Sequence, residues 1–260
     1  MIHLKLFESF EITEPILYGN PLNNKEINIL KGYNVMYPEW ILKDDNYYYI
    51  FDHRCENIKD VPVTYINAVC KKFEISNYTI NDDYSIDVLG NVSISDKKLT
   101  KIPLKFNKVS GYFTCDTNQL TTLLGSPKSV GKSFGCYSNE LTTLEGSPES
   151  VGGIFDCAHN KLTTLEGGPK EVGRNFNCSD NKLTTLEGSP EYVGGYFNCA
   201  GNKLTTLLGS PKKVGGDFEC RDNQLTTLEG APESVGGDFY CSYFPQLTSL
   251  EYKGIKGKNI

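Results

Sequence analysis

Seven cysteines recur along this chain at a fixed interval of 21 residues, and this register restricts the fold more than any other feature. They are Cys115, Cys136, Cys157, Cys178, Cys199, Cys220 and Cys241. A phenylalanine precedes each cysteine by two residues, and an asparagine follows each of the first six by three: Phe113, Phe134, Phe155, Phe176, Phe197, Phe218 and Phe239, with Asn118, Asn139, Asn160, Asn181, Asn202 and Asn223. One unit reads F-x-C-x-x-N-x-L-T-T-L-x-G-x-P-x-x-V-G-x-x. Self-similarity at a period in the twenties predicts a solenoid.

A single unit has too few apolar residues to fold alone, so its apolar side chains must be buried by the units above and below it. The period-2 pattern of Phe-x-Cys predicts a short strand with both side chains on one face. Stacked units then form a parallel sheet with rungs about 4.8 Å apart. The leucines of L-T-T-L face inward, the Pro- and Gly-rich segment turns the chain, and the asparagine bonds backbone groups at the bend.

The pattern F-x-C-x-x-N-x-L-T-T-L resembles the core of the leucine-rich repeat in its short bacterial form. The resemblance covers residues 88–252 and implies a solenoid with a parallel sheet. The chain departs from the family at one position, because the valine (Val109, Val130, Val151) precedes the strand by four residues where the family has a leucine three before it. A parallel β-helix of another kind is the alternative interpretation.

The cysteine register argues against disulfides and against a metal site. Seven of the nine cysteines occupy one inward position, where cysteine acts as a small hydrophobe. Side chains on stacked rungs point in parallel directions, which does not suit the dihedral angle of a disulfide. No C-x-x-C motif occurs, and a filled interior leaves no room for zinc. We therefore expect reduced thiols, a cytoplasmic protein and no cofactor.

Residues 1–87 do not repeat, and they predict a small α+β domain that caps the solenoid. An apolar start (Leu4, Leu6, Phe7 and Phe10) precedes the elements. These are a capped helix from Asn23 to Gly32, a short helix beginning at Pro38 and including Ile41 and Leu42, a strand over Tyr47–Phe51, a helix from Asp60 to Phe73, and a hairpin from Asn77 to Val88. The hairpin leads into the first rung.

The terminal units of the solenoid differ from the others, as is usual where the end of a core must be covered. The first unit keeps the apolar register but has Lys97 in place of the asparagine. In the last unit Phe244 takes the place of the asparagine, and we expect Tyr243, Phe244 and Tyr252 to cover the core. Residues 253–260 are expected to form a flexible tail.

Charge and hydropathy exclude several partners. The net charge is −6. Residues 1–87 hold 14 acidic and 8 basic residues, and the remainder holds 18 of each. Because no basic stripe exists to neutralise phosphates, the sequence argues against nucleic-acid binding. No apolar run is long enough to span a membrane, and the N-terminus lacks the apolar core of a secretion signal.

The positions that flank phenylalanine and cysteine point outward and change from unit to unit, whereas the inward positions scarcely vary. Such a surface predicts protein binding, and its mixture of tyrosines and acids suits a basic partner. The expected partner-binding residues are Tyr112, Tyr137, Ile154, Asp156, Asn175, Asn177, Tyr196, Asn198, Asp217, Glu219, Arg221, Asp238 and Tyr240. The alternative is a solvated sheet face whose variation has no function.

Two other patterns carry weaker predictions. The Thr-Thr pairs, from Thr121 to Thr227, resemble an ice-binding array, but their place between inward leucines predicts hydroxyls that bond to the backbone of the stack. Asp52-His53-Arg54-Cys55 brings an acid, a base and a thiol together, but adjacent residues of a strand face opposite ways. We therefore expect no enzyme and no catalytic residue.

The whole chain also resembles a group of phage-encoded proteins, through the hairpin N-Y-T-I-N-x-D-x-S-I-D-V (Asn77–Val88) and the motif L-T-K-I-P (Leu99–Pro103). The resemblance implies a role in an infected bacterium. The expected function is a non-enzymatic binder of a host bacterial protein, such as an inhibitor of a defence system. A virion structural or assembly component is one alternative, and an N-terminal domain that binds a small ligand or is enzymatic is another. The sequence does not indicate the oligomeric state.

Overall fold

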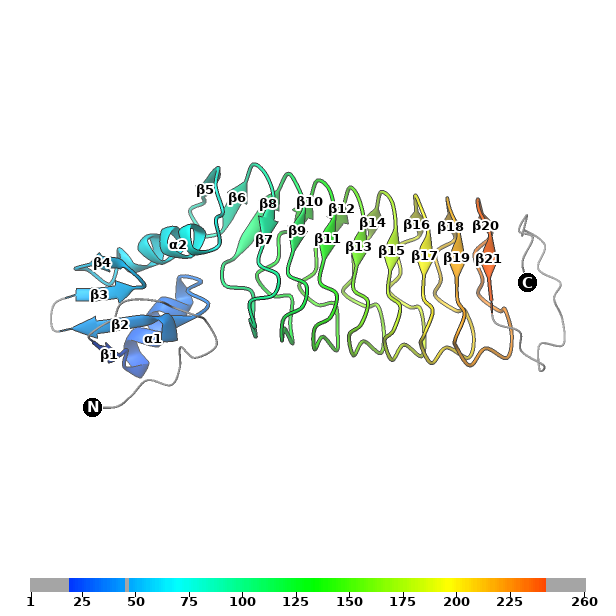
Figure 1. The fold of residues 1–260 in the computed structure, drawn as a ribbon, viewed down its shortest axis with the longest axis horizontal. Coiled ribbons are helices and arrows are strands. Elements are labelled where there is room, and N and C mark those ends of the chain that lie inside the picture. Colours follow the sequence, from blue (N-terminus) through cyan, green and yellow to red (C-terminus); the bar gives the residue numbers. More distant parts are fainter. Residues whose placement is uncertain (1–18, 45–46, 242–260) are drawn as a thin grey trace.

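The repeating units stack into a parallel β-solenoid, with the non-repeating residues at its N-terminal end (Figure 1). The structure is a computed structural model that describes residues 19–44 and 47–241. It confirms the predicted fold class, a mainly β solenoid of 21-residue rungs with a small α+β part before it. The predicted apolar start, the altered last unit and the tail over residues 253–260 lie outside the described residues.

The Phe-x-Cys segments form an eight-stranded parallel sheet, here called the phenylalanine sheet. Each phenylalanine pairs with its counterpart one unit away, as Phe134 does with Phe155. The strands are β7 Val92–Ser93, β9 Phe113–Thr114, β11 Phe134–Gly135, β13 Phe155–Asp156, β15 Phe176–Asn177, β17 Phe197–Asn198, β19 Phe218–Glu219 and β21 Phe239–Tyr240. The predicted strand and its in-register stacking are therefore confirmed.

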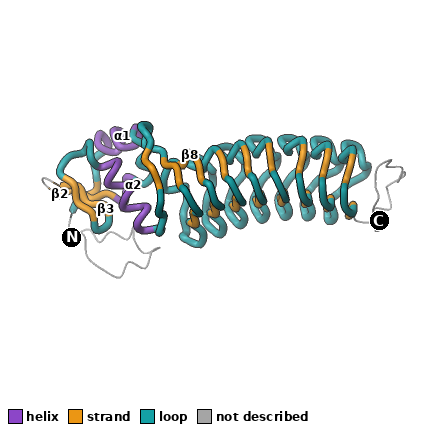
Figure 2. Tube along the Cα trace, turned by 90° about the horizontal axis from the view of Figure 1, so that it is seen from above, coloured by secondary structure: helices purple, strands orange, loops and turns teal. Residues whose placement is uncertain are grey.

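The valines form a second sheet of nine strands, here called the valine sheet, which the repeat pattern did not predict. Its strands are β5 Tyr78–Ile80, β6 Ile86–Val88, β8 Phe106–Val109, β10 Ser129–Val130, β12 Ser150–Val151, β14 Glu171–Val172, β16 Tyr192–Val193, β18 Lys213–Val214 and β20 Ser234–Val235. All pairs are parallel except β5–β6, so the second strand of the predicted hairpin already belongs to the solenoid. Figure 2 shows the coils following one another without interruption.

The interior between the sheets is filled by identical side chains from successive units. Rings from Phe113 to Phe239 are stacked with centroids between 5.1 and 5.5 Å apart. The six repeat cysteines from Cys115 to Cys220 are buried, and most donate their thiol to a carbonyl of the next unit, as Cys157 Sγ does to Asn177 O at 3.4 Å. None of the nine cysteines, all of which lie in the described part of the chain, forms a disulfide.

Each repeat asparagine joins two neighbouring coils. Asn160 Nδ2 donates to the carbonyl of Cys157 at 3.1 Å and to that of Cys136, one coil earlier, at 3.0 Å. Its Oδ1 accepts the backbone N–H of Leu141 at 3.0 Å. Asn139, Asn181 and Asn202 repeat this pattern, so the predicted ladder of amide bonds at the bend is confirmed.

Glycine forms the corner between the two sheets because the coils approach each other too closely there for a side chain. A Cβ on Gly152 would lie 2.3 Å from the carbonyl oxygen of Gly131 on the preceding coil. Real Cβ atoms do not approach backbone atoms so closely. The V-G segment of the repeat is thus a packing requirement as much as a turn signal.

The N-terminal part contains a four-stranded antiparallel sheet and two helices. Its elements are β1 Asn20–Pro21, α1 Asn24–Gly32, a 3-10 helix Pro38–Trp40, β2 Ile41–Asp44, β3 Tyr47–Ile50, β4 His53–Cys55 and α2 Val61–Lys72. Asn23 and Glu26 form a reciprocal capping box at the start of α1. The helix predicted at Pro38 is only one 3-10 turn, and Ile41 and Leu42 belong to β2.

Buried tyrosines join this part to the first coil. The hydroxyl of Tyr65 on α2 donates to the carbonyl of Pro103 at 2.8 Å and accepts the N–H of Tyr37 at 3.2 Å. The hydroxyl of Tyr37 donates to the carbonyl of Lys101 at 2.7 Å. One continuous cluster of buried residues runs from the N-terminal sheet through the coils, so the open end of the solenoid core is covered.

Candidate protein-binding face

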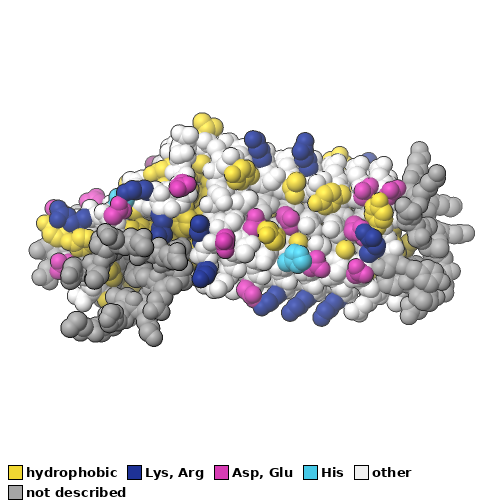
Figure 3. All heavy atoms as spheres, in the orientation of Figure 1, with side chains coloured by type: hydrophobic (Ala, Val, Ile, Leu, Met, Phe, Trp, Pro, Cys, Tyr) yellow, Lys and Arg dark blue, Asp and Glu magenta, His cyan; other side chains and the backbone are white. Residues whose placement is uncertain are grey.

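The outer side of the phenylalanine sheet carries every residue that the sequence predicted for partner binding. Because Phe and Cys point inward, the residues between and beside them point outward. Tyr112, Tyr137 and Tyr196 are exposed, with 39%, 40% and 37% of their surface accessible. Hydrophobic side chains are dispersed among acidic ones on this side of the solenoid (Figure 3).

The thirteen predicted residues form one surface along the coils, and none of them is buried. Tyr112, Tyr137, Tyr196 and Arg221 are exposed. The other nine are half-buried: Ile154, Asp156, Asn175, Asn177, Asn198, Asp217, Glu219, Asp238 and Tyr240. We call these thirteen residues the outer face. Gly135, Ala158 and Ser179, which occupy equivalent positions, are buried and contribute little surface.

Several polar residues of the outer face also accept hydrogen bonds from the backbone, a role that the repeat pattern does not predict. Asp217 Oδ1 accepts the N–H of Asp238 on the next coil at 2.8 Å, and Asn175 Oδ1 accepts that of Tyr196 at 3.1 Å. Asn198 Oδ1 accepts the N–H of Ala200, two residues on, at 3.0 Å. Short acceptor side chains are therefore favoured at these positions by the fold itself.

An acidic pair, Asp116 and Asp156, lies on the outer side of the phenylalanine sheet, in its N-terminal half. The carboxylate of Asp116 leans across Gly135, where a Cβ would come within 2.6 Å of Asp116 Oδ1. Burial, together with the negative charge of Asp156, raises the pKa of Asp116 to about 6, although the N–H of Tyr137 bonds its carboxylate at 3.0 Å. Asp116 was not among the predicted residues, because its half-buried position depends on the missing side chain at Gly135.

At the C-terminal end of the outer face, the single arginine is already neutralised. Arg221 donates from Nε and from a terminal nitrogen to the two carboxylate oxygens of Glu219, at 2.7 and 2.6 Å. Its guanidinium also lies over the ring of Tyr240 at 5.2 Å. Neither Asp217 nor Asp238 forms an ion pair with Arg221, and the hydroxyl of Tyr240 donates to Asp238 at 3.1 Å.

The structure also shows the contacts of the threonine pairs and of the segment from Asp52 to Cys55. Second threonines of the pairs accept backbone N–H groups, as Thr164 Oγ1 does from Glu166, and Thr164 also donates to Glu187 O on the next coil at 3.1 Å. In the N-terminal part, His53 Nδ1 lies 2.7 Å from Asp52 Oδ1. Burial raises the pKa of the Cys55 thiol, which disfavours the thiolate that nucleophilic attack requires.

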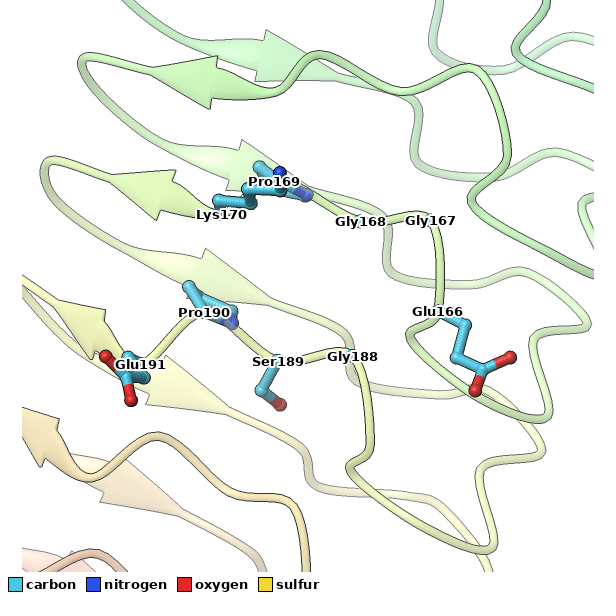
Figure 4. Close-up of a pocket in the computed structure, with 9 residues that line it drawn as sticks. All are labelled: Glu166, Gly167, Gly168, Pro169, Lys170, Gly188, Ser189, Pro190 and Glu191. Carbon is cyan, nitrogen blue, oxygen red and sulfur yellow. The ribbon is translucent and has the colours of Figure 1, made fainter.

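A groove lies on the opposite side of the coils, between the turns that precede β14 and β16 (Figure 4). Its lining residues are Glu166, Gly167, Gly168, Pro169, Lys170, Gly188, Ser189, Pro190 and Glu191. Gly168 stands where the neighbouring units have Ser147 and Ser189, so one coil lacks a side chain at this point. The groove is open to solvent and was not predicted.

Metal sites and membrane-spanning helices are both missing from the part of the chain that the structure describes. No group of three or more His, Cys, Asp or Glu in residues 19–44 and 47–241 could hold a metal ion. No helix in the same ranges is long and apolar enough to cross a membrane. Comparison of the chain with family models, with curated proteins and with solved structures found no match.

Proposed function

We propose that the protein is a non-enzymatic binding protein whose outer face docks onto a basic surface of another protein. The observation that carries this proposal is the combination of three exposed tyrosines with four aspartates on one side of a rigid sheet. The aspartates are Asp116, Asp156, Asp217 and Asp238, and none of them forms an ion pair with a lysine or arginine among the described residues.

The chemistry of the face suits a protein partner better than a small ligand. Tyrosine contributes large contact area at a low cost in side-chain entropy and is enriched among residues that dominate binding energy. Unpaired carboxylates attract arginines and lysines of a partner and repel other acidic surfaces. The ladder of identical core residues keeps the spacing of these groups fixed, which lowers the entropic cost of binding.

The resemblance to phage-encoded proteins extends the proposal to the partner's origin. A host bacterial protein, such as a component of a defence system that the binder inhibits in the cytoplasm, is the partner that this resemblance implies. The leucine-rich-repeat resemblance agrees with such a role, because solenoids present extended binding surfaces.

The test is recovery of a partner from bacterial lysate with tagged full-length protein, followed by reconstitution of the complex from purified components. The double variant Asp217→Lys/Asp238→Lys should weaken the complex by roughly 10- to 100-fold, since two attractive charges become repulsive. Tyr196→Ala should weaken it by about tenfold through lost contact area. Isothermal titration calorimetry gives both values.

A matched control reverses two acids elsewhere. Glu145→Lys/Glu166→Lys makes the same charge change at exposed positions beside the L-T-T-L segment. This control should bind the partner with unchanged affinity. Equal losses in both double variants would show that only net charge matters, and unchanged binding in both would place the contact elsewhere. Either result would contradict the proposal.

A further inference from the structure

A ladder of alternating charge runs along the turn that enters the valine sheet, two residues before each valine. It consists of Lys128, Glu149, Lys170, Glu191, Lys212 and Glu233. All six side chains are exposed. Neighbouring positions are held in register by the backbone, as where the N–H of Glu149 donates to Lys128 O and that of Lys170 to Glu149 O, both at 2.9 Å.

Within one molecule, alternation removes the repulsion that a column of like charges would suffer at rung spacing. Glu191 and Lys212 form an ion pair at 2.5 Å on adjacent coils. An ion pair of this kind requires opposite charges only on two adjacent coils. Alternation along the whole stack is not needed for the fold, because other outward positions carry like charges on successive coils. Lys161, Lys182 and Lys203, for example, succeed one another in a single column.

The ladder has a further property that arises from its even number of charges. A two-fold axis that lies in the plane of contact, perpendicular to the ladder, and passes between Lys170 and Glu191 reverses the order of the six residues. Lys170 then faces Glu191 of a second copy, Glu149 faces Lys212, and Lys128 faces Glu233. Every charge therefore meets its opposite, which is the self-complementarity that an isologous contact requires.

The centre of the ladder carries an apolar group and a recess. Tyr192, next to Glu191, is 55% exposed and is the most exposed tyrosine of the described residues. The groove of Figure 4 lies between the same two coils, on the other side of the ladder, and includes Pro169 and Gly168. The same two-fold operation places Tyr192 of each copy opposite Glu171 of the other, beside the central pairs of Lys170 and Glu191.

We propose that the valine-sheet side binds a second copy of this chain, forming an antiparallel two-fold dimer with the charge ladder and Tyr192 at its centre. Five rung steps make the ladder about 24 Å long. The surface area buried in the contact is therefore small. The dimer is weak, and its population depends on the protein concentration and the salt concentration. The outer face lies on the other sheet and remains free to bind a different protein.

The decisive experiment reverses every sign of the ladder at once. The variant K128E/E149K/K170E/E191K/K212E/E233K keeps the net charge, the alternation within the chain and the self-complementarity. It should dimerise as the wild-type protein does, but the two proteins should not dimerise with each other, because mixed pairs place like charges opposite. Native mass spectrometry of an equimolar mixture of full-length proteins should show mixed dimers far below the statistical half.

Tyr192→Ala provides a second measurement that leaves the ladder intact. It should weaken dimerisation by about tenfold in sedimentation equilibrium. Val63→Ala, which truncates a residue of α2 that is 41% exposed, is the control and should leave the dimer unchanged. The proposal is overturned if the wild-type protein stays monomeric up to about 1 mM, beyond the weakest specific contacts, or if mixed dimers reach the statistical share.

Discussion

At the scale of single residues, the carboxyl group of Asp116, beside the outer face, shows how strongly the neighbouring coil determines the pKa of a side chain. Asp116 leans into the space that Gly135 leaves open, and both burial and the charge of Asp156 raise its pKa to about 6. A raised pKa means that the folded protein binds the proton more tightly than the unfolded chain does. Ionised Asp116 therefore destabilises the fold, and stability falls as the pH rises from about 4 to about 6.

Asp116→Asn should remove this dependence. The amide keeps an oxygen that accepts the N–H of Tyr137 but carries no charge at any pH. We expect the variant to be more stable than the wild-type protein at pH 7, by roughly 1–2 kcal/mol after allowing for the partial exposure of the carboxyl group. Chemical denaturation should show the difference disappearing toward pH 4. The exposed Asp96→Asn is the control, and a difference independent of pH would disprove the assigned cause.

Sequence patterns predicted the inward residues well and the outward ones incompletely. The asparagine ladder and the cysteine column follow from chemistry that repeats in every unit, so a single unit suffices to predict them. The bonds of Asp217 and Asn175 to the next coil are different, because they depend on which residue lies one coil away. Asp116 was missed for the same reason.

At the scale of elements, the corner between the sheets determines how closely the coils can stack. The Pro- and Gly-rich segment predicts a turn, but it also contains a strand of the valine sheet. Only Val and the residue before it are extended there, as in Ser150–Val151, and two residues give no alternating pattern to recognise. The sheet becomes evident only when the copies are stacked.

Gly152→Ala tests the corner directly. The added Cβ would meet the carbonyl oxygen of Gly131 at 2.3 Å, so the coils must separate and their hydrogen bonds must lengthen. We expect a loss of more than about 1 kcal/mol in the free energy of unfolding, measured by denaturant titration. Gly32→Ala at the end of α1 has nothing within 4 Å of its added Cβ and is the control. Equal effects of the two substitutions would refute the packing argument.

At the scale of the whole molecule, the N-terminal part and the coils share one core, so the cap is expected to unfold together with the first coil. Its sequence predicted α1, β3, α2 and the hairpin, because each carries its own local signal. The tyrosine contacts to Lys101 and Pro103 were not predictable, since they join residues far apart in the chain.

The variant Tyr65→Phe tests how much the hydroxyl of Tyr65 stabilises the junction between the N-terminal part and the first coil. The substitution keeps the ring but leaves the buried carbonyl of Pro103 and the N–H of Tyr37 without their hydroxyl partner. We expect a loss of about 1–3 kcal/mol in the free energy of unfolding. Amide hydrogen exchange should show faster exchange in α2 and the first coils, and unchanged exchange in the central coils. Uniform acceleration throughout the solenoid would contradict a local role for the junction.

Because the charges of the ladder alternate, two ladders match only when the number of charged repeat units is even. Adding one unit that continues the alternation would leave an odd row of charges whose midpoint is itself a charge, and a rotated twin would then meet like with like all along it. Adding two such units would restore the match. Repeat arrays readily lengthen or shorten by whole units, so a lineage of such chains could gain or lose self-recognition in single steps while every fold-determining residue stayed the same.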